Sequence, residues 1–374
     1  MSQAVIVGYV RSPFTLSNKG ALAGTRPDDI ATEVVKALVE RTGVNTHDID
    51  DLLMGCAFPE GEQGFNIARM VALQAGLPQT VAGATINRWC GSSMEAIHIA
   101  AGNIATGKGE VFICAGVESM TRIPMGGYNP LPNPVLFKSL PEAYISMGLT
   151  AENVAKQCHV SRADQEQFAL NSHKKAAAAD MSGEIVPIPT KGGVVDKDGI
   201  VRPNSTADDL AKLNPAFDVY GTVTAGTSSP LTDGAAAVLV TSEAYAKKHN
   251  LPVLAKIKSM AVVGLDPKVM GLGPIYAVNK ALEKAGLTIN DIDVAEINEA
   301  FSAQAIPCGQ QLGIPPEKLN IEGGAIAIGH PLGASGARIT GKAALLLKRG
   351  GGKYAVSAAC IGGGMGIATV LEKA

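Results

Sequence analysis

Cys90 lies where a predicted β-strand gives way to a predicted helix, a position that can make a thiol reactive. The apolar, β-prone run 80–86 precedes it, and Ser92 or Ser93 could cap the helix that follows. One face of that helix is apolar, at Met94, Ile97, Ala101 and Ile104. Free N–H groups and the helix dipole at such a junction lower the pKa of a thiol and favour the nucleophilic thiolate. A buried, unreactive thiol is the alternative, because free cysteines are among the most buried residues.

The glycine-rich stretch 323–338 contains a second candidate, His330. Its five glycines let the backbone approach a ligand closely and free N–H groups at a helix start. Pro331 restricts the backbone of the histidine before it. The alternative is a tight turn with an incidental histidine, since the stretch fits neither G-x-G-x-x-G nor a phosphate loop ending in G-K-[ST].

Two further stretches place polar or sulfur-bearing side chains at the ends of predicted strands. The glycine-rich segment 360–366 lies between the predicted strands 353–359 and 367–372, and its N–H groups could form an oxyanion hole. A hairpin with a buried thiol is the alternative. Asn298 and the glutamate after it end another predicted strand, which indicates either a helix cap or a site.

Alternating strands and helices must position these residues. In the first half the pattern predicts strands at 51–57, 80–86 and 111–116, and helices at 28–42, 65–76 and 92–106. This alternation is typical of parallel strands with right-handed crossovers.

The second half repeats the first. The Lys-Ala-Leu, Gly and Asp-Ile-Asp series at 36–50 recurs at 280–293 with one residue of slack. Cys90 lies 42 residues after Asp48, and His330 lies 39 residues after Asp291. Both candidates therefore lie at comparable switch points of two doubly wound sheets, where open α/β sheets bind ligands. If the halves pack about a pseudo-twofold axis, the two residues can meet.

Between the halves the sequence changes character. Residues 124–141 predict irregular loop, and helices are predicted at 151–158 and at 161–180, the second with a capping-box pattern. The strand-like run 234–240 is predicted to rejoin the first sheet. The predicted division is an N-terminal half of residues 1–118 plus 230–250, an inserted loop subdomain of residues 119–229, and a C-terminal half of residues 251–374.

Composition excludes several classes of protein. A formal net charge of −2 over 374 residues, without a basic run, gives no electrostatic basis for binding nucleic acid or an anionic membrane. Six widely spaced cysteines without a C-x-x-C pair argue against a disulfide framework and a zinc site. No signal peptide, membrane span or C-terminal address is recognisable, so a cytoplasmic location is expected.

Together, the four stretches resemble the thiolase family. Its signatures occur in its order: Asn-Arg-x-Cys-Gly-Ser-Ser-Met at 87–94, Asn-Glu-Ala-Phe at 298–301, the Gly-His-Pro motif within 323–338, and Cys-x-Gly-Gly-Gly-x-Gly at 360–366. The resemblance runs from Ala4 to Val370 and implies a five-layered αβαβα fold of two similar halves with an inserted loop subdomain.

The resemblance also implies roles for individual residues. Cys90 would be the nucleophile, His330 the base that activates it, and Cys360 a second acid and base. Asn298, through a water, would form one oxyanion hole with His330, and the N–H groups of Cys90 and Gly362 the other. Five positions match contacts of coenzyme A or the pocket: Ser229 at the pantetheine arm, Arg202 near the nucleotide, and Met147, Phe217 and Phe301 along the pocket.

The implied reaction is thiolytic cleavage of a 3-ketoacyl-CoA by the co-substrate coenzyme A, without a metal or redox group. Acetoacetyl-CoA thiolases typically have histidine where Ser146 stands, and 201–203, 224–229 and 260–267 look more like degradative 3-ketoacyl-CoA thiolases. Glu322 departs from the family pattern, which usually has asparagine there.

Three other functions remain as alternatives. A biosynthetic acetyl-CoA acetyltransferase would use the same residues with a shorter acyl pocket. A cysteine hydrolase or thioesterase would use Cys90 and His330 with water and would not need Cys360. A non-catalytic acyl-CoA or sterol carrier would not need Cys90, Asn298, His330 and Cys360 all to be intact. The resemblance further implies a homodimer or homotetramer, and some degradative members join a hydratase/dehydrogenase chain in a β-oxidation complex.

Overall fold

The first half of the chain builds a five-stranded sheet with the order β1-β8-β5-β3-β4. The computed structural model describes residues 2–350 and 352–374. The strands of this sheet are β1 (Ala4–Arg11), β3 (Asp51–Gly55), β4 (Ala82–Ile86), β5 (Val111–Ser119) and β8 (Thr232–Ser242), and the short β2 (Thr15–Leu16) pairs with β8. β1, β5 and β8 are buried along their whole length, as their continuous apolar sequences require.

The second half repeats this arrangement in the order β9-β12-β11-β10. Its strands are β9 (Ala255–Gly264), β10 (Val294–Ile297), β11 (Tyr354–Ile361) and β12 (Met365–Lys373). A short antiparallel ladder, in which Val5 and Ile6 face Lys256 and Ala255, joins β1 to β9 and makes the two sheets continuous.

The prediction of parallel strands is confirmed for part of each sheet. β3 is parallel to β4 and β5, and β10 is parallel to β11. It is wrong elsewhere, because β8 runs antiparallel to β1 and β5, and β12 runs antiparallel to β11 and β9. β8 returns to the first sheet after the inserted segment, as its sequence predicted. Its direction depends on the end of the sheet at which the inserted segment finishes.

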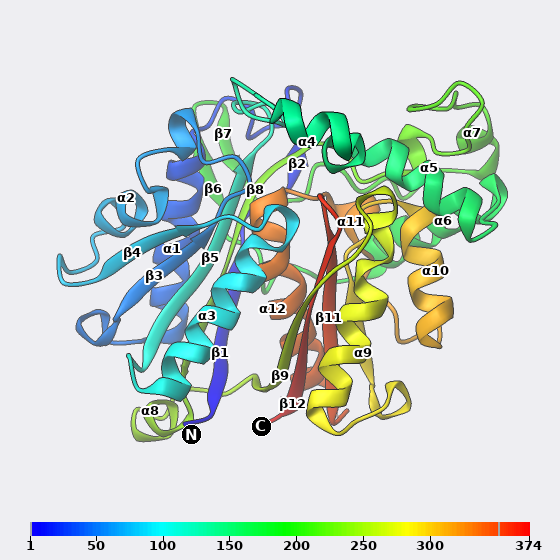
Figure 1. Cartoon of the computed structure of the whole chain (residues 1–374). Coiled ribbons are helices and arrows are strands. Elements are labelled where there is room, and N and C mark those ends of the chain that lie inside the picture. The colour runs from blue at the N-terminus through cyan, green and yellow to red at the C-terminus, as the bar shows by residue number, and fades with distance from the viewer. Residues whose placement is uncertain (1, 351) are drawn as a thin grey trace.

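Helices make the five-layered fold that was predicted (Figure 1). The central layer is α3 (Ser92–Thr106) and α12 (Leu332–Gly350), and α12 contacts strands of both sheets. The outer layers are α1 (Pro27–Thr42) and α2 (Ile67–Gln74) on one side and α9 (Gly273–Ala285) and α10 (Ser302–Leu312) on the other. The shorter helices are α8 (Glu243–Lys248) and α11 (Ala325–Ile328).

The internal repeat has a structural counterpart. Asp50 Oδ2 accepts hydrogen bonds from the N–H groups of Glu110 and Val111, at 2.7 and 3.0 Å, where β5 begins. In the second half, Asp293 Oδ2 accepts from the two N–H groups at residues 353–354, at 2.6 and 3.2 Å, where β11 begins. Each repeated aspartate therefore fixes the start of the equivalent strand.

The segment between β5 and β8 contains more regular structure than predicted. Its elements are α4 (Pro134–Ser139), α5 (Met147–Gln157), α6 (Arg162–Ala178), α7 (Ala207–Ala211), β6 (Ile188–Thr190) and β7 (Gly193–Val195). The prediction of irregular loop over 124–141 is wrong at α4, where Asn133 accepts from two backbone N–H groups and Pro134 occupies the first turn. The capping box of Ser161 and Asp164 is confirmed at α6.

Seven short 3₁₀ helices complete the described part of the chain, at Thr46–Asp48, Gly61–Gln63, Trp89–Gly91, Pro141–Tyr144, Ala225–Thr227, Pro267–Leu272 and Ile289–Asp291. None of the helices within residues 2–350 and 352–374 has the length and apolar character needed to cross a membrane.

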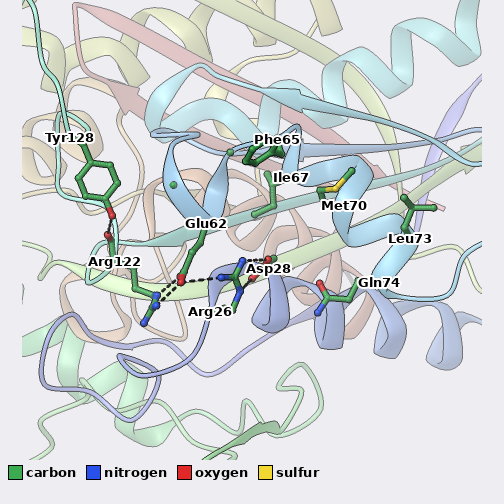
Figure 2. Close-up of a pocket in the computed structure, with 12 residues that line it drawn as sticks. Arg26, Asp28, Glu62, Phe65, Ile67, Met70, Leu73, Gln74, Arg122 and Tyr128 are labelled. Carbon is green, nitrogen blue, oxygen red and sulfur yellow. Dashed lines mark hydrogen bonds and ion pairs between the residues drawn. The ribbon is translucent and has the colours of Figure 1, made fainter.

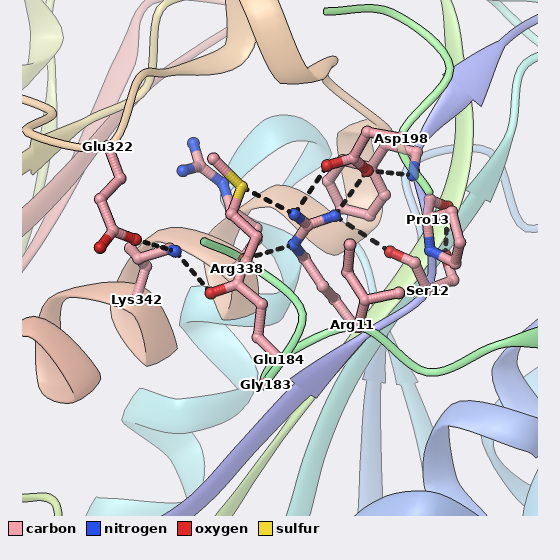
Figure 3. A network of polar contacts seen from close by, with 12 residues as sticks. Arg11, Ser12, Pro13, Gly183, Glu184, Asp198, Glu322, Arg338 and Lys342 are labelled. Atoms are coloured by element: carbon pink, nitrogen blue, oxygen red, sulfur yellow. Dashed lines mark hydrogen bonds and ion pairs between the residues drawn. The ribbon is translucent and has the colours of Figure 1, made fainter. Parts of the chain in front are cut away.

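A buried network of charges connects β1, the segment between β5 and β8, and α12 (Figure 3). Arg11 contacts Glu184 at 2.6 Å and Asp198 at 2.7 Å, and its side chain is fully buried. Lys342 contacts Glu184 at 2.5 Å and Glu322 at 2.6 Å. Because an uncompensated buried charge is costly, these pairs fix how the three parts of the chain fit together. Glu322, the departure from the family pattern, thus has a structural partner.

Candidate active site

A cavity of about 200 Å³ lies where the carboxyl ends of the two sheets meet. Cys90, His330 and Cys360 all line it, although they are far apart in the sequence. Four of the other predicted residues line the same cavity: Met147, Phe217, Ser229 and Phe301. The sequence hypothesis that Cys90 and His330 meet therefore agrees with the packing of the two halves.

Cys90 lies in the 3₁₀ turn Trp89–Gly91 that connects β4 to α3. The prediction that a serine caps α3 is wrong, because Gly91 is the residue before the helix and no side chain caps it. The Ser92 hydroxyl instead accepts from the N–H of Arg88 and donates to the Trp89 carbonyl. Ser93 Oγ accepts from the N–H of Ala337 in α12, at 2.8 Å. Ser92 therefore holds the turn, and Ser93 links the start of α3 to α12.

Burial raises the pKa of the Cys90 thiol to about 12, although the N–H groups of Gly362 and of Cys90 itself point at the sulfur and oppose that rise. The prediction that the strand–helix junction lowers the pKa of this thiol is therefore wrong, because desolvation of the sulfur outweighs the backbone N–H groups that favour the thiolate. The thiol is neutral near pH 7, and its proton must be removed during the reaction.

His330 lines the same cavity as Cys90 and could accept such a proton. Its Nδ1 lies 2.5 Å from Ser335 Oγ, and Ser335 Oγ lies 3.0 Å from the carbonyl oxygen of Pro331. The hydroxyl proton is donated to that carbonyl, so Ser335 Oγ accepts from Nδ1–H, and Nε2 carries the lone pair. Burial, and secondarily the charge of Arg338, lowers the pKa of His330 to about 3. The imidazole is thus neutral and oriented as a base through Nε2.

Asn298 follows β10 and is buried beside the histidine. Its Nδ2 lies 3.2 Å from His330 Nε2, and its N–H donates to the carbonyl of Ala358 in β11. Within the described part of the chain, its carboxamide Oδ1 is buried and has no hydrogen-bond partner. A buried amide oxygen without a partner is costly, and a bound water or ligand donor would satisfy it.

Cys360 is the penultimate residue of β11, a strand that is buried along its whole length. The segment is a hairpin, in which Cys360 pairs with Gly366 and the turn glycines Gly363 and Gly364 have φ of 74° and 83°. Burial, and then the neighbouring Cys90, raises the pKa of the Cys360 thiol. The two interpretations of segment 360–366, a hairpin with a buried thiol and part of a site, are therefore both correct in geometry. A second neutral thiol, that of Cys360, lines the cavity.

Aromatic and methionine side chains form the apolar wall. Phe217 and Phe301 meet edge to face, with ring centroids 5.9 Å apart and an interplanar angle of 83°. Met147 begins α5, and the N–H of Ser229 donates to the carbonyl of Ala300 at 2.9 Å. The methionines of the lining are Met120, Met125, Met147 and Met270. Such flexible, apolar side chains suit a substrate with an alkyl part.

Arg202 is not brought to the cavity. Its side chain is exposed, and its N–H donates to His173 Nδ1 at 3.2 Å. Two residues that sequence reasoning missed do support the site. Ser335 orients His330, and its position five residues after the histidine in the same motif was the available signal. Glu118, near the end of β5, binds backbone N–H groups beside the loops of Cys90 and His330. Its lone position in an apolar strand was the signal.

No group of three His, Cys, Asp or Glu side chains that could hold a metal ion occurs in the described ranges. What the cavity does offer is a neutral base, two thiols and inward-pointing N–H groups. A base beside a thiol can generate a nucleophile for an acyl carbon, and N–H groups can stabilise the oxyanion that results. A second thiol can carry a proton to or from another atom of the substrate.

The chain is similar over its whole length to known proteins. Residues 4–244 match the family described as thiolase, N-terminal domain, and residues 251–373 match thiolase, C-terminal domain. The chain is 46% identical to 3-ketoacyl-CoA thiolases of Bacillus subtilis and Aliivibrio fischeri, with 100% of each chain covered. The crystal structure of human mitochondrial 3-ketoacyl-CoA thiolase matches with a TM-score of 0.91 at 38% identity, covering 100% of this chain and 99% of that one.

Proposed function

The chain belongs to the thiolase family, and on that premise we propose that it is an acyltransferase that cleaves 3-ketoacyl-CoA with coenzyme A. The products are acetyl-CoA and an acyl-CoA shortened by two carbons, as in fatty acid β-oxidation. The observation that carries the proposal is the meeting of two thiols, Cys90 and Cys360, with the neutral base His330 in one cavity.

The first half of the reaction transfers the acyl group to the enzyme. His330 Nε2 accepts the proton of the Cys90 thiol, and the thiolate attacks C3 of the substrate. The C2–C3 bond then breaks, and the electron pair passes to the acetyl-CoA enolate. Asn298 with a water, together with protonated His330, stabilises that enolate, and the thiol of Cys360 donates a proton to C2.

The second half returns the enzyme to its starting state. The thiolate of Cys360 accepts the proton of the coenzyme A thiol, and the new thiolate attacks the acyl carbon on Cys90. The N–H groups of Cys90 and Gly362 stabilise the oxyanion of the tetrahedral intermediate. Cys90 leaves and takes back the proton from His330. Protons and electrons balance over the cycle, so no redox group takes part.

The co-substrate site that we propose continues outward from these residues. Ser229 would contact the pantetheine arm, and Met147, Phe217 and Phe301 would flank it, since all four line the cavity. Arg202, which is exposed outside the cavity, would contact the nucleotide end.

The degradative direction is favoured over the biosynthetic one. The relatives at 44–46% identity are named 3-ketoacyl-CoA thiolase. Ser146, which stands where acetoacetyl-CoA thiolases typically have histidine, lines the cavity beside Met147. A hydrolase or a carrier would not need Cys360, because neither function requires a second acid and base for a carbon atom.

We also propose a homodimer, or a homotetramer built from it. The outer edge of β4 has no strand partner within the described residues, and open edges favour pairing with another chain. Beside it lies a surface groove of about 910 Å³ (Figure 2), with Phe65, Met70 and Leu73 along one side. Phe65 is 91% exposed and has a φ of 53°, an unfavourable state for an aromatic residue. Covering this patch with a second copy would explain both features.

Three further proposals follow from the family and the composition. The chain divides into the N-terminal half of residues 1–118 plus 230–250, the inserted subdomain of residues 119–229 and the C-terminal half of residues 251–374. The cytoplasm is the proposed location, and it suits a protein whose six cysteines are all free. A hydratase/dehydrogenase chain is a further proposed partner, as in β-oxidation complexes.

Thiolysis of two substrates by the purified protein tests the function. One is a C4 and the other a C10–C16 3-ketoacyl-CoA, each with free coenzyme A. Faster turnover of the longer substrate is expected, and Cys90→Ala should abolish it. Activity confined to acetoacetyl-CoA would assign the acetyltransferase instead, and a Cys90→Ala variant that keeps more than about a tenth of the rate would refute the nucleophile.

A further inference from the structure

Glu118 does not line the cavity, yet its carboxylate touches both halves of the molecule next to the two catalytic loops. We propose that Glu118 is a positioning residue, which sets the place of His330 relative to Cys90 by holding the start of α12 against the ends of β3 and β5. The proposal rests on the proposed function for its kinetic consequence, but its geometry does not depend on the substrate.

The carboxylate is fully used as an acceptor. Its Oε2 lies 2.8 Å from the N–H of Ala57, after β3, and 2.8 Å from the N–H of Gly333, in the first turn of α12. Its Oε1 accepts from Gln63 Nε2 at 2.8 Å and from the N–H of Phe58 at 3.3 Å. Only 1% of Glu118 is exposed, so water does not compete for these donors. One side chain thus joins a strand end of the first half to the helix that follows His330.

The start of α12 needs such an acceptor from outside. The first turn of a helix has unpaired N–H groups and a positive partial charge, which a carboxylate stabilises. The first turn of α12 contains no acidic residue. Glu118 supplies the charge from the other half of the chain, and Gly333, which it binds, lies only three residues after His330.

The backbones of β5 and α12 approach each other here so closely that no side chain fits between them. A Cβ on Gly116 would lie 2.1 Å from the carbonyl oxygen of Gly333, and a Cβ on Gly333 would lie 2.5 Å from that of Val117. Next to the junction, Cys90 packs in one apolar cluster with Leu332, the residue between Pro331 and Gly333. A shift of the α12 start therefore displaces the His330 loop and the surroundings of Cys90 together.

Replacing the carboxylate by an amide keeps the size of the side chain and removes half of its acceptors. In Glu118→Gln, the amide NH₂ would face N–H donors, either those of Ala57 and Gly333 or those of Gln63 and Phe58. Two donors would lose their acceptor and repel the new NH₂ group. Proton transfer and attack depend steeply on the distance between base and nucleophile, so a displacement well under 1 Å is enough to slow both.

The test compares Glu118→Gln with Asp50→Asn, which removes a carboxylate that binds two N–H groups at the opposite end of β5, away from α12. Steady-state thiolysis gives kcat and KM, thermal unfolding reports folding, and iodoacetamide reports the rate of Cys90 alkylation. For Glu118→Gln we expect kcat to fall about tenfold or more with KM changed less than about threefold, and alkylation to slow. Asp50→Asn should keep kcat and the alkylation rate.

Each outcome decides the proposal. Folded Glu118→Gln with the kcat and alkylation rate of the native chain would overturn it, as would an equal loss of kcat in both variants. If Glu118→Gln does not fold, Glu118→Asp, which keeps the charge on a shorter arm, replaces it with the same expected direction. If the native chain shows no thiolysis but Glu118→Gln still slows alkylation, the proposed function fails and the positioning role stands.

Discussion

Burial sets the protonation state of the groups that would do the chemistry. It raises the pKa of both thiols, to about 12 for Cys90, and lowers that of His330 to about 3, so all three are neutral at pH 7. Charge is therefore absent from the cavity until a substrate arrives, when the inward N–H groups can stabilise it. The proposed mechanism requires the lone pair of His330 on Nε2, and the hydrogen bond between Nδ1 and Ser335 keeps it there.

Replacing Ser335 by alanine should disturb the base rather than binding. Without Oγ, Nδ1–H loses its acceptor, so the imidazole can rotate or adopt the other tautomer. We expect kcat to fall by about 10- to 100-fold with KM nearly unchanged, and Ser335→Thr to keep most of the activity because it retains the hydroxyl. Steady-state kinetics of both variants provide the measurement, and an alanine variant with native kcat would contradict this role.

At the residue scale, sequence reasoning could identify the candidates but not their environment. Cys90, His330, Asn298 and Cys360 lie in recognisable motifs, and the structure places them together. The thiol pKa could not be predicted, because the burial of Cys90 comes from residues of both halves. Arg202 remains a prediction, since an exposed side chain at the edge of a site takes its meaning from a ligand.

At the scale of elements, α12 approaches β3 and β5 at a junction that admits no side chain. In Gly116→Ala the new Cβ would lie 2.1 Å from the Gly333 carbonyl, so one backbone must move. We expect this variant to lose about 3 kcal/mol or more of unfolding free energy. Gly102→Ala is the matched control, because no atom lies within 4 Å of its Cβ in α3. Urea unfolding should show it about 0.5–1 kcal/mol more stable than the native chain; equal effects of the two substitutions would contradict the close junction.

The contact between α3 and β12 should depend on pH through His98. Burial, then the charges of Arg88 and Lys284, lowers the pKa of His98 to about 3, and one ring nitrogen lies 2.8 Å from Thr369 Oγ1. Below the unfolded value of about 6.5, the unfolded chain binds a proton that the folded chain does not, so stability falls as pH falls. Between pH 7.5 and 5.5 the native chain should lose about 1 kcal/mol more unfolding free energy than His98→Gln. Identical losses in urea unfolding at the two pH values would show that His98 is not held neutral.

Elements with a strong local signal could be predicted from the sequence, and those fixed by distant partners could not. α1 and α3 match their predicted bounds because an apolar face, a proline or a closing glycine marks them. The short α4 was missed because a proline- and glycine-rich background obscured its Asn-Pro start. The antiparallel direction of β8 has no local signal, since it depends on the path of the inserted segment.

At the scale of the molecule, charges buried between the two halves and the inserted segment fix one arrangement of the parts. That arrangement places the carboxyl ends of the parallel strands of both sheets at one cavity. It also leaves the outer edge of β4 without a strand partner among the residues that the structure describes. The duplication itself was visible in the sequence, because the repeated aspartates are retained in both halves. Each of them binds backbone N–H groups at the start of the equivalent strand, β5 or β11. The buried ion network was not visible, since its members are far apart in the chain.

The open edge predicts that association depends on Phe65. Phe65→Asp places a charge on the exposed apolar side of the groove beside β4, so it should convert the proposed dimer to monomer. Val194→Asp is the control, because Val194 is 66% exposed on β7, outside that groove. Sedimentation of the native chain and both variants provides the measurement; an oligomer that survives Phe65→Asp and is lost in Val194→Asp would place the interface elsewhere.

The central claim is that an acyl group passes through the sulfur of Cys90. The most direct test is to mix the protein with a 3-ketoacyl-CoA without free coenzyme A, quench with acid, and locate the covalent acyl group by peptide mass spectrometry. We predict one acyl group per chain as a thioester on Cys90, released when coenzyme A is added and absent in Cys90→Ala. An acyl group on another residue, or turnover without any acyl-enzyme, would contradict the account.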